Sequence, residues 1–147
     1  MTRDFGMSAA RNDVLSEVLT LIRLRGELVY TAWLGAPWGL RFQPGPAHFH
    51  FVERGGAWVT PAGGAPTWIG AGDLVLLPLG KGHVIADAKE TPAEDIDVVA
   101  SEHFDRDELV LRHGGGGEPS QLVSGFFSFE GSPLPAVMAA LASSSVT

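Results

Sequence analysis

The sequence contains no cysteine among its 147 residues. Disulfide bonds, zinc–thiolate centres and thiol nucleophiles are therefore excluded as sources of stability or chemistry. Basic residues are also scarce, with ten Lys and Arg against 17 Asp and Glu, which gives a formal net charge of −7. Because binding to a phosphate backbone depends on clustered Lys and Arg, this balance predicts that the chain itself has no nucleic-acid partner.

Long hydrophobic runs are missing as well. No apolar stretch reaches the roughly 18 residues that a membrane-spanning helix needs. The sequence also shows no charged start followed by the apolar core of a secretory signal. We therefore expect a cytoplasmic protein with no membrane partner.

Hydrophobic residues, glycine and proline are abundant instead. The chain is 45% hydrophobic and 18% charged, which is typical of a soluble globular protein. Its length suits one domain with one hydrophobic core. The 19 glycines and ten prolines are spread along the chain and favour many short strands joined by tight turns.

Short β-like segments with frequent turn signals occupy most of the chain, as in a β-sandwich or barrel. An acidic segment, 87–97, is expected to be a solvated loop because its charges need water. The predicted strands are 28–34, 40–42, 48–52, 57–60, 66–69, a strand–turn–strand unit over 72–87, two weaker strands at 98–99 and 109–111, and a last strand at 121–130.

Helical periodicity occurs near the two ends of the chain. Apolar residues recur at helical spacing from Asp13 to Ile22 and predict an amphipathic helix of about three turns. The segment Leu134–Leu141 predicts a short helix with Pro135 in its first turn. The resulting division is a flexible lead-in over 1–12, one domain over 13–142 and a tail over 143–147.

The segment from Gly72 to Asp87 carries a specific spacing. Gly72 is followed by five residues, then Pro78 and Gly80 with one residue between them, then two residues and His83, and then three residues and Asp87. This resembles the second motif of the cupin superfamily, in which Asn occupies the position of Asp87. The resemblance implies an all-β fold, the cupin double-stranded β-helix or jelly-roll barrel, here with an N-terminal amphipathic helix and a short C-terminal helix.

A wider resemblance covers residues 13–141. It rests on stretches that follow one another in a fixed order: Ala36–Arg41, Phe49–Gly55, Trp58, Gly72–Pro78, Gly82–Asp87, Gly114–Gly117 and Val123–Phe129. Together they are similar to the cupin-type N-terminal sensor domain of AraC-type transcription regulators. That family binds a small organic ligand inside the barrel, often dimerises, and binds DNA through a separate helix-turn-helix region. The resemblance implies a small-molecule partner and a homodimer. Because the helix-turn-helix region has no counterpart here, we expect a regulator fragment or a free-standing relative.

Three histidines lie in or beside the cupin-like motifs. Alternation along a strand places His48 and His50 on one face, predicted to be the barrel interior, and His83 approaches the same cavity. Three neutral imidazoles could bind Zn²⁺, Fe²⁺ or Mn²⁺. Metal-binding cupins carry a glutamate three or four residues after the His-x-His pair, where Arg54 and Gly55 stand here. The comparison favours a protein without a cofactor and leaves a metal site of the three histidines as an alternative.

Without a metal or a thiol, the site could promote a reaction by orienting a flexible substrate and by transferring protons. His50 and His83 are the predicted acid–base residues. Further side chains are predicted to bind the ligand as cavity walls: His48, Trp33, Trp38, Trp58, Trp68, Phe127, Phe129 and Met138.

Three functional hypotheses follow. The first, narrowly favoured, is a stand-alone cupin that binds a small apolar metabolite and cyclises or isomerises it without metal, as in secondary-metabolite or polyketide biosynthesis. The second is a non-catalytic ligand-sensing domain of an AraC-type regulator, as a fragment or free-standing. The third is a metal-dependent cupin enzyme. Conversion of a bound ligand separates the first from the second.

Overall fold

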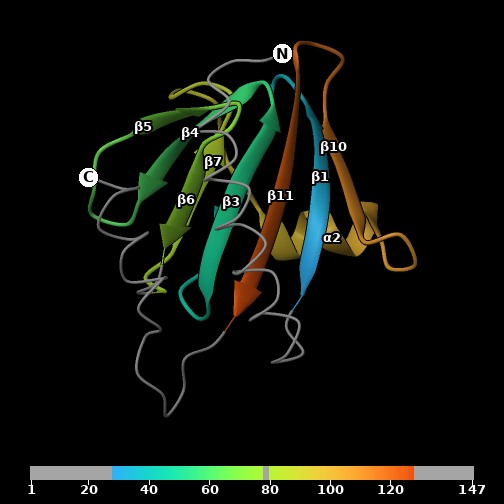
Figure 1. Cartoon of the computed structure of the whole chain (residues 1–147), viewed down its shortest axis with the longest axis horizontal. Helices are drawn as coiled ribbons and strands as arrows, with labels where there is room; N and C mark the ends of the chain where they lie inside the picture. Colours follow the sequence, from blue (N-terminus) through green and yellow to red (C-terminus); the bar gives the residue numbers. More distant parts are fainter. Residues whose placement is uncertain (1–27, 78–79, 128–147) are drawn as a thin grey trace.

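The computed structural model of the chain describes residues 28–77 and 80–127. These residues form two β-sheets that enclose one core, with a short helix, α2, at one side (Figure 1). The predicted all-β jelly-roll is confirmed. The predicted helices at 13–22 and 134–141 lie outside the described residues, as do Phe129 and Met138.

The first sheet has six strands, antiparallel except for the parallel pair β1 and β10. Its spatial order is β6 (Leu74–Leu77), β3 (Ala47–Arg54), β11 (Pro119–Phe127), β1 (Val29–Gly35), β10 (Val110–Gly114) and β9 (Phe104–Asp105).

The second sheet has five strands, antiparallel except for the parallel pair β2 and β8. Its order is β5 (Thr67–Gly70), β4 (Gly56–Pro61), β7 (His83–Ala86), β2 (Gly39–Phe42) and β8 (Glu94–Asp95). The predicted strands from 28 to 87 thus correspond to β1–β7 within a few residues.

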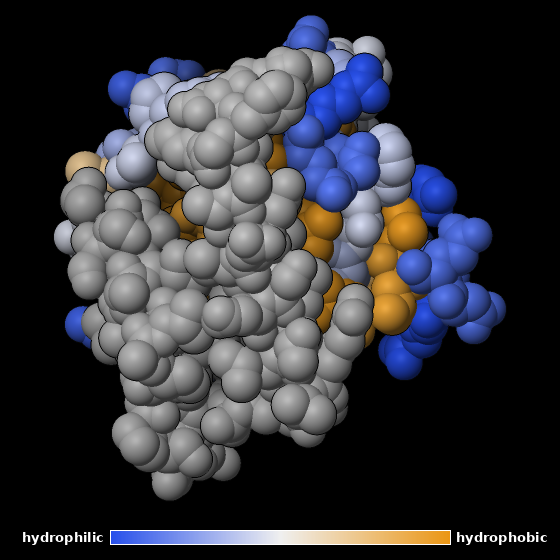
Figure 2. All heavy atoms as spheres, in the orientation of Figure 1, coloured by the Kyte–Doolittle hydropathy of each residue, from blue (hydrophilic) through white to orange (hydrophobic). Residues whose placement is uncertain are grey.

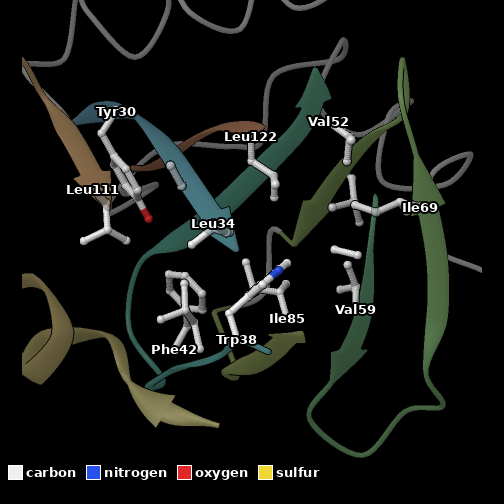
Figure 3. Close-up of a cluster of buried hydrophobic side chains, with 14 of the residues drawn as sticks. Tyr30, Leu34, Trp38, Phe42, Val52, Val59, Ile69, Ile85, Leu111 and Leu122 are labelled. Atoms are coloured by element: carbon white, nitrogen blue, oxygen red, sulfur yellow. The ribbon is translucent and has the colours of Figure 1, made fainter. Parts of the chain in front are cut away.

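The core lies between the two sheets because alternate side chains of each strand point inward. In β1, Tyr30, Ala32 and Leu34 are buried while Trp33 between them is exposed. Figure 3 shows Leu34 and Leu122 of the first sheet opposite Val59 and Ile85 of the second. Each large side chain buried in this way contributes about 1.5–3 kcal/mol to stability.

Helix α2 (Ile96–His103) corrects the sequence analysis, which predicted a strand at 98–99. The Asp95 side chain caps the helix by accepting a hydrogen bond from the Asp97 backbone N–H at 2.9 Å. Val99 is buried against the core, whereas Val98 points to solvent. Two adjacent valines therefore belong to different helix faces. The loop predicted over 87–97 is irregular only over 87–93, because β8 and the first two residues of α2 occupy 94–97.

Two glycines of the cupin-like motif shape the turn between β6 and β7. Gly80 and Gly82 both have positive φ, 63° and 92°. A Cβ atom on Gly80 would collide with the Gly45 backbone oxygen, and Gly80 accepts a hydrogen bond from the Gly45 N–H at 2.9 Å. Glycine is needed here because it adopts positive φ without strain and allows two backbones to touch.

On the face seen in Figure 2, hydrophilic residues gather on the side where β10 and the β9–β10 turn lie in Figure 1. Arg112 and Glu108 form a long, exposed ion pair of 3.8 Å there. None of the described residues forms a helix with the length and apolar character of a membrane span.

Candidate ligand-binding site

A cavity of about 310 Å³ lies where the first sheet meets α2 and the end of β2. Strands β1, β3, β10 and β11 each contribute one wall residue, and α2 contributes three. Most of the lining is apolar or aromatic. The described residues that line it are Leu28, Tyr30, Phe42, Gln43, Pro44, Pro46, His48, Ile96, Asp97, Ala100, Phe104, Leu111 and Phe126.

Aromatic rings form much of this wall. Tyr30 and Phe104 meet edge to face, with ring centroids 5.9 Å apart. The ring of His48 lies 5.0 Å from Phe42 and 6.0 Å from Phe126. In Figure 3, Tyr30 and Leu111 lie on neighbouring strands on the side of the core nearest α2.

The three histidines converge, as the strand alternation and the motif predicted. Phe42 is at their centre: its ring stacks on His83 at 4.5 Å and makes edge contacts with His48 and His50. All three imidazoles are buried. His48 lines the cavity, whereas His50 and His83 do not.

A chain of hydrogen bonds links the cavity wall to the buried histidines. Tyr30 shares a side-chain hydrogen bond with Ser124. The Ser124 Oγ atom is 2.7 Å from His50 Nδ1, and His50 Nε2 is 2.9 Å from His83 Nε2. One of the two facing Nε2 atoms must carry a proton and donate it to the other.

Burial keeps these groups uncharged. Desolvation lowers the pKa of His48 to about 4 and, together with the nearby His48, lowers the pKa of His83 to about 3. The pKa of His50 lies well below the usual value, chiefly because the ring is completely buried. Burial also raises the pKa of Tyr30 far above its usual value, although the Ser124 hydrogen bond partly opposes this.

The spacing of the three histidine rings is relevant to the metal-dependent alternative. His50 and His83 point their Nε2 atoms at each other and form a hydrogen bond, and the His48 ring centroid is 5.1 Å from His83 and 6.3 Å from His50. Among the described residues, no group of three or more His, Cys, Asp or Glu side chains could hold a metal ion. The metal-dependent alternative stays a prediction.

The four tryptophans predicted as cavity walls lie away from this cavity. Trp38 is buried in the core, and its Nε1 atom has no hydrogen-bond partner within the described part of the chain. Trp58 and Trp68 pack edge to face on the second sheet, with the Lys89 ammonium over the Trp58 ring. Trp33 borders a wider second depression together with His113, whose Nε2 is 3.1 Å from Glu94 Oε2. The Phe127 backbone belongs to β11, and its predicted role stays a prediction.

Sequence reasoning missed most of the residues that line the cavity. Tyr30 could have been identified as an inward-facing residue, because alternation along β1 places it on the same face as Leu34. Ile96 and Ala100 could have been found from helical spacing after the capping residue Asp95. Phe104 had no comparable signal, because it lines the cavity only once β9 pairs with β10.

Two comparisons with known proteins bear on the site. A family model described as Cupin matches residues 13–146. A curated relative, named as an AraC-like transcription regulator of Streptomyces lividans, is 32% identical over 119 residues. The match covers 80% of this chain and 38% of the relative, so the chain spans well under half of that protein.

Proposed function

The chain belongs to the cupin family, and from this premise we propose that it is a ligand-sensing module whose barrel binds one small, mainly apolar organic molecule. The observation that supports the proposal is the cavity of about 310 Å³ beside α2, which has aromatic walls and few polar groups. Pockets for small molecules commonly combine apolar walls with a few polar groups that fix orientation.

The apolar body of the ligand would pack against Phe42, Phe104, Leu111 and Phe126. Each methylene group removed from water contributes roughly 0.8 kcal/mol to binding. His48 offers the ligand a neutral imidazole, and the described residues give that imidazole no hydrogen-bond partner of their own. The proposed ligand therefore carries at least one polar group that reaches His48.

The protonation of the histidines favours binding over acid–base catalysis. A general acid or base works best when its pKa is close to the operating pH. The pKa values of His48 and His83 are about 4 and about 3, so at neutral pH both are weak bases and neither holds an acidic proton to donate. The same neutral rings are well suited to hydrogen bonding.

The similarity to a named transcription regulator supports a sensing role, although this chain matches only part of that protein. The relative's name describes regulation of transcription, and this chain matches 38% of that protein. For this chain we propose only the recognition of a small molecule, which rests on the cavity. Residues or proteins outside the cavity would convert ligand binding into a signal.

A second candidate is cyclisation or isomerisation of the bound molecule. The observation that favours it is the hydrogen-bonded chain from Tyr30 through Ser124 to His50 and His83, which begins at the cavity. Such a chain can hold a proton and pass it along. Incubation with an apolar polyene, followed by mass spectrometry and chromatography, tests this candidate, because binding without a product removes it.

Ligand binding itself can be measured with N-phenyl-1-naphthylamine, an uncharged apolar fluorophore whose emission rises in a dry site. Ala100 lines the cavity and Val98, two residues earlier on α2, is 57% exposed. We expect Ala100→Phe to fill the cavity and weaken binding at least tenfold. We expect Val98→Phe, the same addition of a ring on the solvent side of the helix, to leave binding within twofold of the unmodified chain.

Circular dichroism of both variants checks that each is folded. Equal loss of fluorescence in the two variants would show that the fluorophore does not enter the cavity. Absence of any saturable signal with the unmodified chain would remove the proposed function.

A further inference from the structure

The cavity combines aromatic walls, a neutral imidazole and a carboxylate at its mouth, and from this combination we infer that its ligand is an organic amine carried on an apolar body and bound in its protonated form. The inference rests on the proposed function, because it assigns a chemical class to the ligand of the same cavity. It excludes carboxylates and phosphates as preferred ligands.

The aromatic walls provide the first contribution. Tyr30, Phe42, Phe104 and Phe126 all line the same space of about 310 Å³. The faces of aromatic rings carry partial negative charge and attract ammonium groups, most strongly where water is excluded. One side of the Phe42 ring is covered by the neutral His83, which places no positive charge behind it.

His48 provides the second contribution. Because burial keeps its pKa near 4, the imidazole is neutral at pH 7 and has one nitrogen free of protons that can accept a hydrogen bond. An ammonium N–H can donate to that nitrogen. A carboxylate would gain a charged partner only from protonated His48, which is roughly one molecule in a thousand at pH 7.

The third contribution is the distribution of formal charge around the opening. Asp97 is exposed and lines the cavity, and no Lys or Arg is among the described lining residues. Asp95, two residues before Asp97, accepts a hydrogen bond from the Gln43 side-chain amide at 2.7 Å. Arg41 is the nearby cation and acts on Asp95. Among the described residues, the carboxylates of Asp95 and Asp97 are near the guanidinium of Arg41, and this local balance is negative, which favours the entry of a cation.

Three commercially available probes with the same phenylbutyl body separate these contributions from hydrophobic binding: 4-phenylbutylamine, 4-phenylbutan-1-ol and 4-phenylbutanoate. Each is titrated at pH 7.5 against the full chain carrying N-phenyl-1-naphthylamine, and displacement gives its dissociation constant. We expect the amine to bind about tenfold more tightly than the alcohol and at least a hundredfold more tightly than the carboxylate.

The variant Asp97→Asn tests the carboxylate at the mouth. We expect it to reduce the preference for amine over alcohol by about threefold, with little change in the affinity for the alcohol. Asp107→Asn is the matched control: it removes the same charge from an exposed residue that lines neither cavity. This control should retain the full amine preference.

Failure of this inference can be distinguished from failure of the proposed function. Displacement by the alcohol or the carboxylate at least as strong as displacement by the amine would overturn the amine assignment and leave a ligand-binding cavity in place. If neither the fluorophore nor any of the three probes binds, both are overturned. Equal amine preference in Asp97→Asn and Asp107→Asn would also contradict the part assigned to Asp97.

Discussion

Phe42 shows how one side chain assembles the interior of the site. It comes from β2 in the second sheet, while His48 and His50 come from β3 in the first. Its ring centroid lies within 4.5 to 5.2 Å of all three histidine rings. The cluster is therefore a contact between sheets, so its stability and its protonation depend on the closed barrel.

This dependence predicts that the stability of the fold decreases as the pH falls from 7.5 to 5.5. In the folded chain the pKa values of His48 and His83 are about 4 and about 3, and that of His50 is also well below 6.5. In the unfolded chain these three histidines, with pKa values near 6.5, take up protons in this range, whereas in the folded chain they do not. Each buried histidine should lower the free energy of unfolding by about 1.4 kcal/mol at pH 5.5.

Urea denaturation at the two pH values measures this loss, which should total about 4 kcal/mol. His48→Phe should remove about one third of it, because one titrating group is gone. His103→Gln is the control, since His103 is half exposed on α2, and the pH dependence should not change. A stability that is constant or rises toward pH 5.5 would contradict buried, neutral histidines.

Individual residues also show which parts of the site could be predicted from the sequence. Strand alternation and the Gly72–Asp87 spacing predicted that the three histidines face one cavity; their rings do lie together, but only His48 lines the cavity. The four tryptophans were expected to line the cavity as aromatic walls. Aromatic character does not say which face of a sheet a side chain occupies, and Trp33 and Trp68 lie largely outside, 42% and 49% exposed.

At the scale of elements, β strands were easier to predict than α2. Strands β1–β7 were predicted from their apolar patterns and from Gly or Pro turns, which are local signals. Helix α2 has eight residues, of which only Val99 is buried. Its two adjacent valines are typical of a β-strand sequence, and an isolated helix of this length is not stable in water. Packing against the core and the Asp95 cap stabilise it, and packing cannot be read from a short window of sequence.

Asp87 is another residue that acts through the elements it connects. Its Oδ1 atom accepts hydrogen bonds from the Trp38 backbone N–H at 2.9 Å and from Thr91 Oγ1 at 2.8 Å. The Asp87 N–H donates to the Trp38 carbonyl at 3.0 Å. The carboxylate thus fastens the end of β7 to the segment that enters β2.

We expect Asp87→Ala to lower the free energy of unfolding by about 2–3 kcal/mol, because two hydrogen bonds to a charged acceptor are lost. Asp87→Asn keeps a carbonyl oxygen at the same place and should cost less than about half as much. Urea denaturation at pH 7.5 gives both values. Equal losses in the two variants would show that charge, rather than hydrogen bonding, makes the connection.

At the scale of the whole molecule, the cavity lies where separately predictable parts meet. Its walls include β1, β3, β10 and β11 of the first sheet, Phe42 of the second, and the helix α2 between β8 and β9. The two-sheet architecture followed from the sequence because many short strands and the cupin-like spacing agreed. The position of the cavity could not be predicted from the sequence, because it depends on how α2 covers the open side of the first sheet.

This shared construction predicts that a bound ligand stabilises the whole described domain rather than one loop. A ligand that binds only the folded state raises the free energy of unfolding by about 2.7 kcal/mol at a concentration one hundred times its dissociation constant. Urea denaturation with 4-phenylbutylamine, followed by circular dichroism, should show this increase with an unchanged slope against urea concentration. Val98→Phe should show the same increase and Ala100→Phe almost none, because only Ala100 lines the cavity. An increase that is equal in both variants would place the amine outside the cavity, and a changed slope would indicate that the ligand orders only part of the chain.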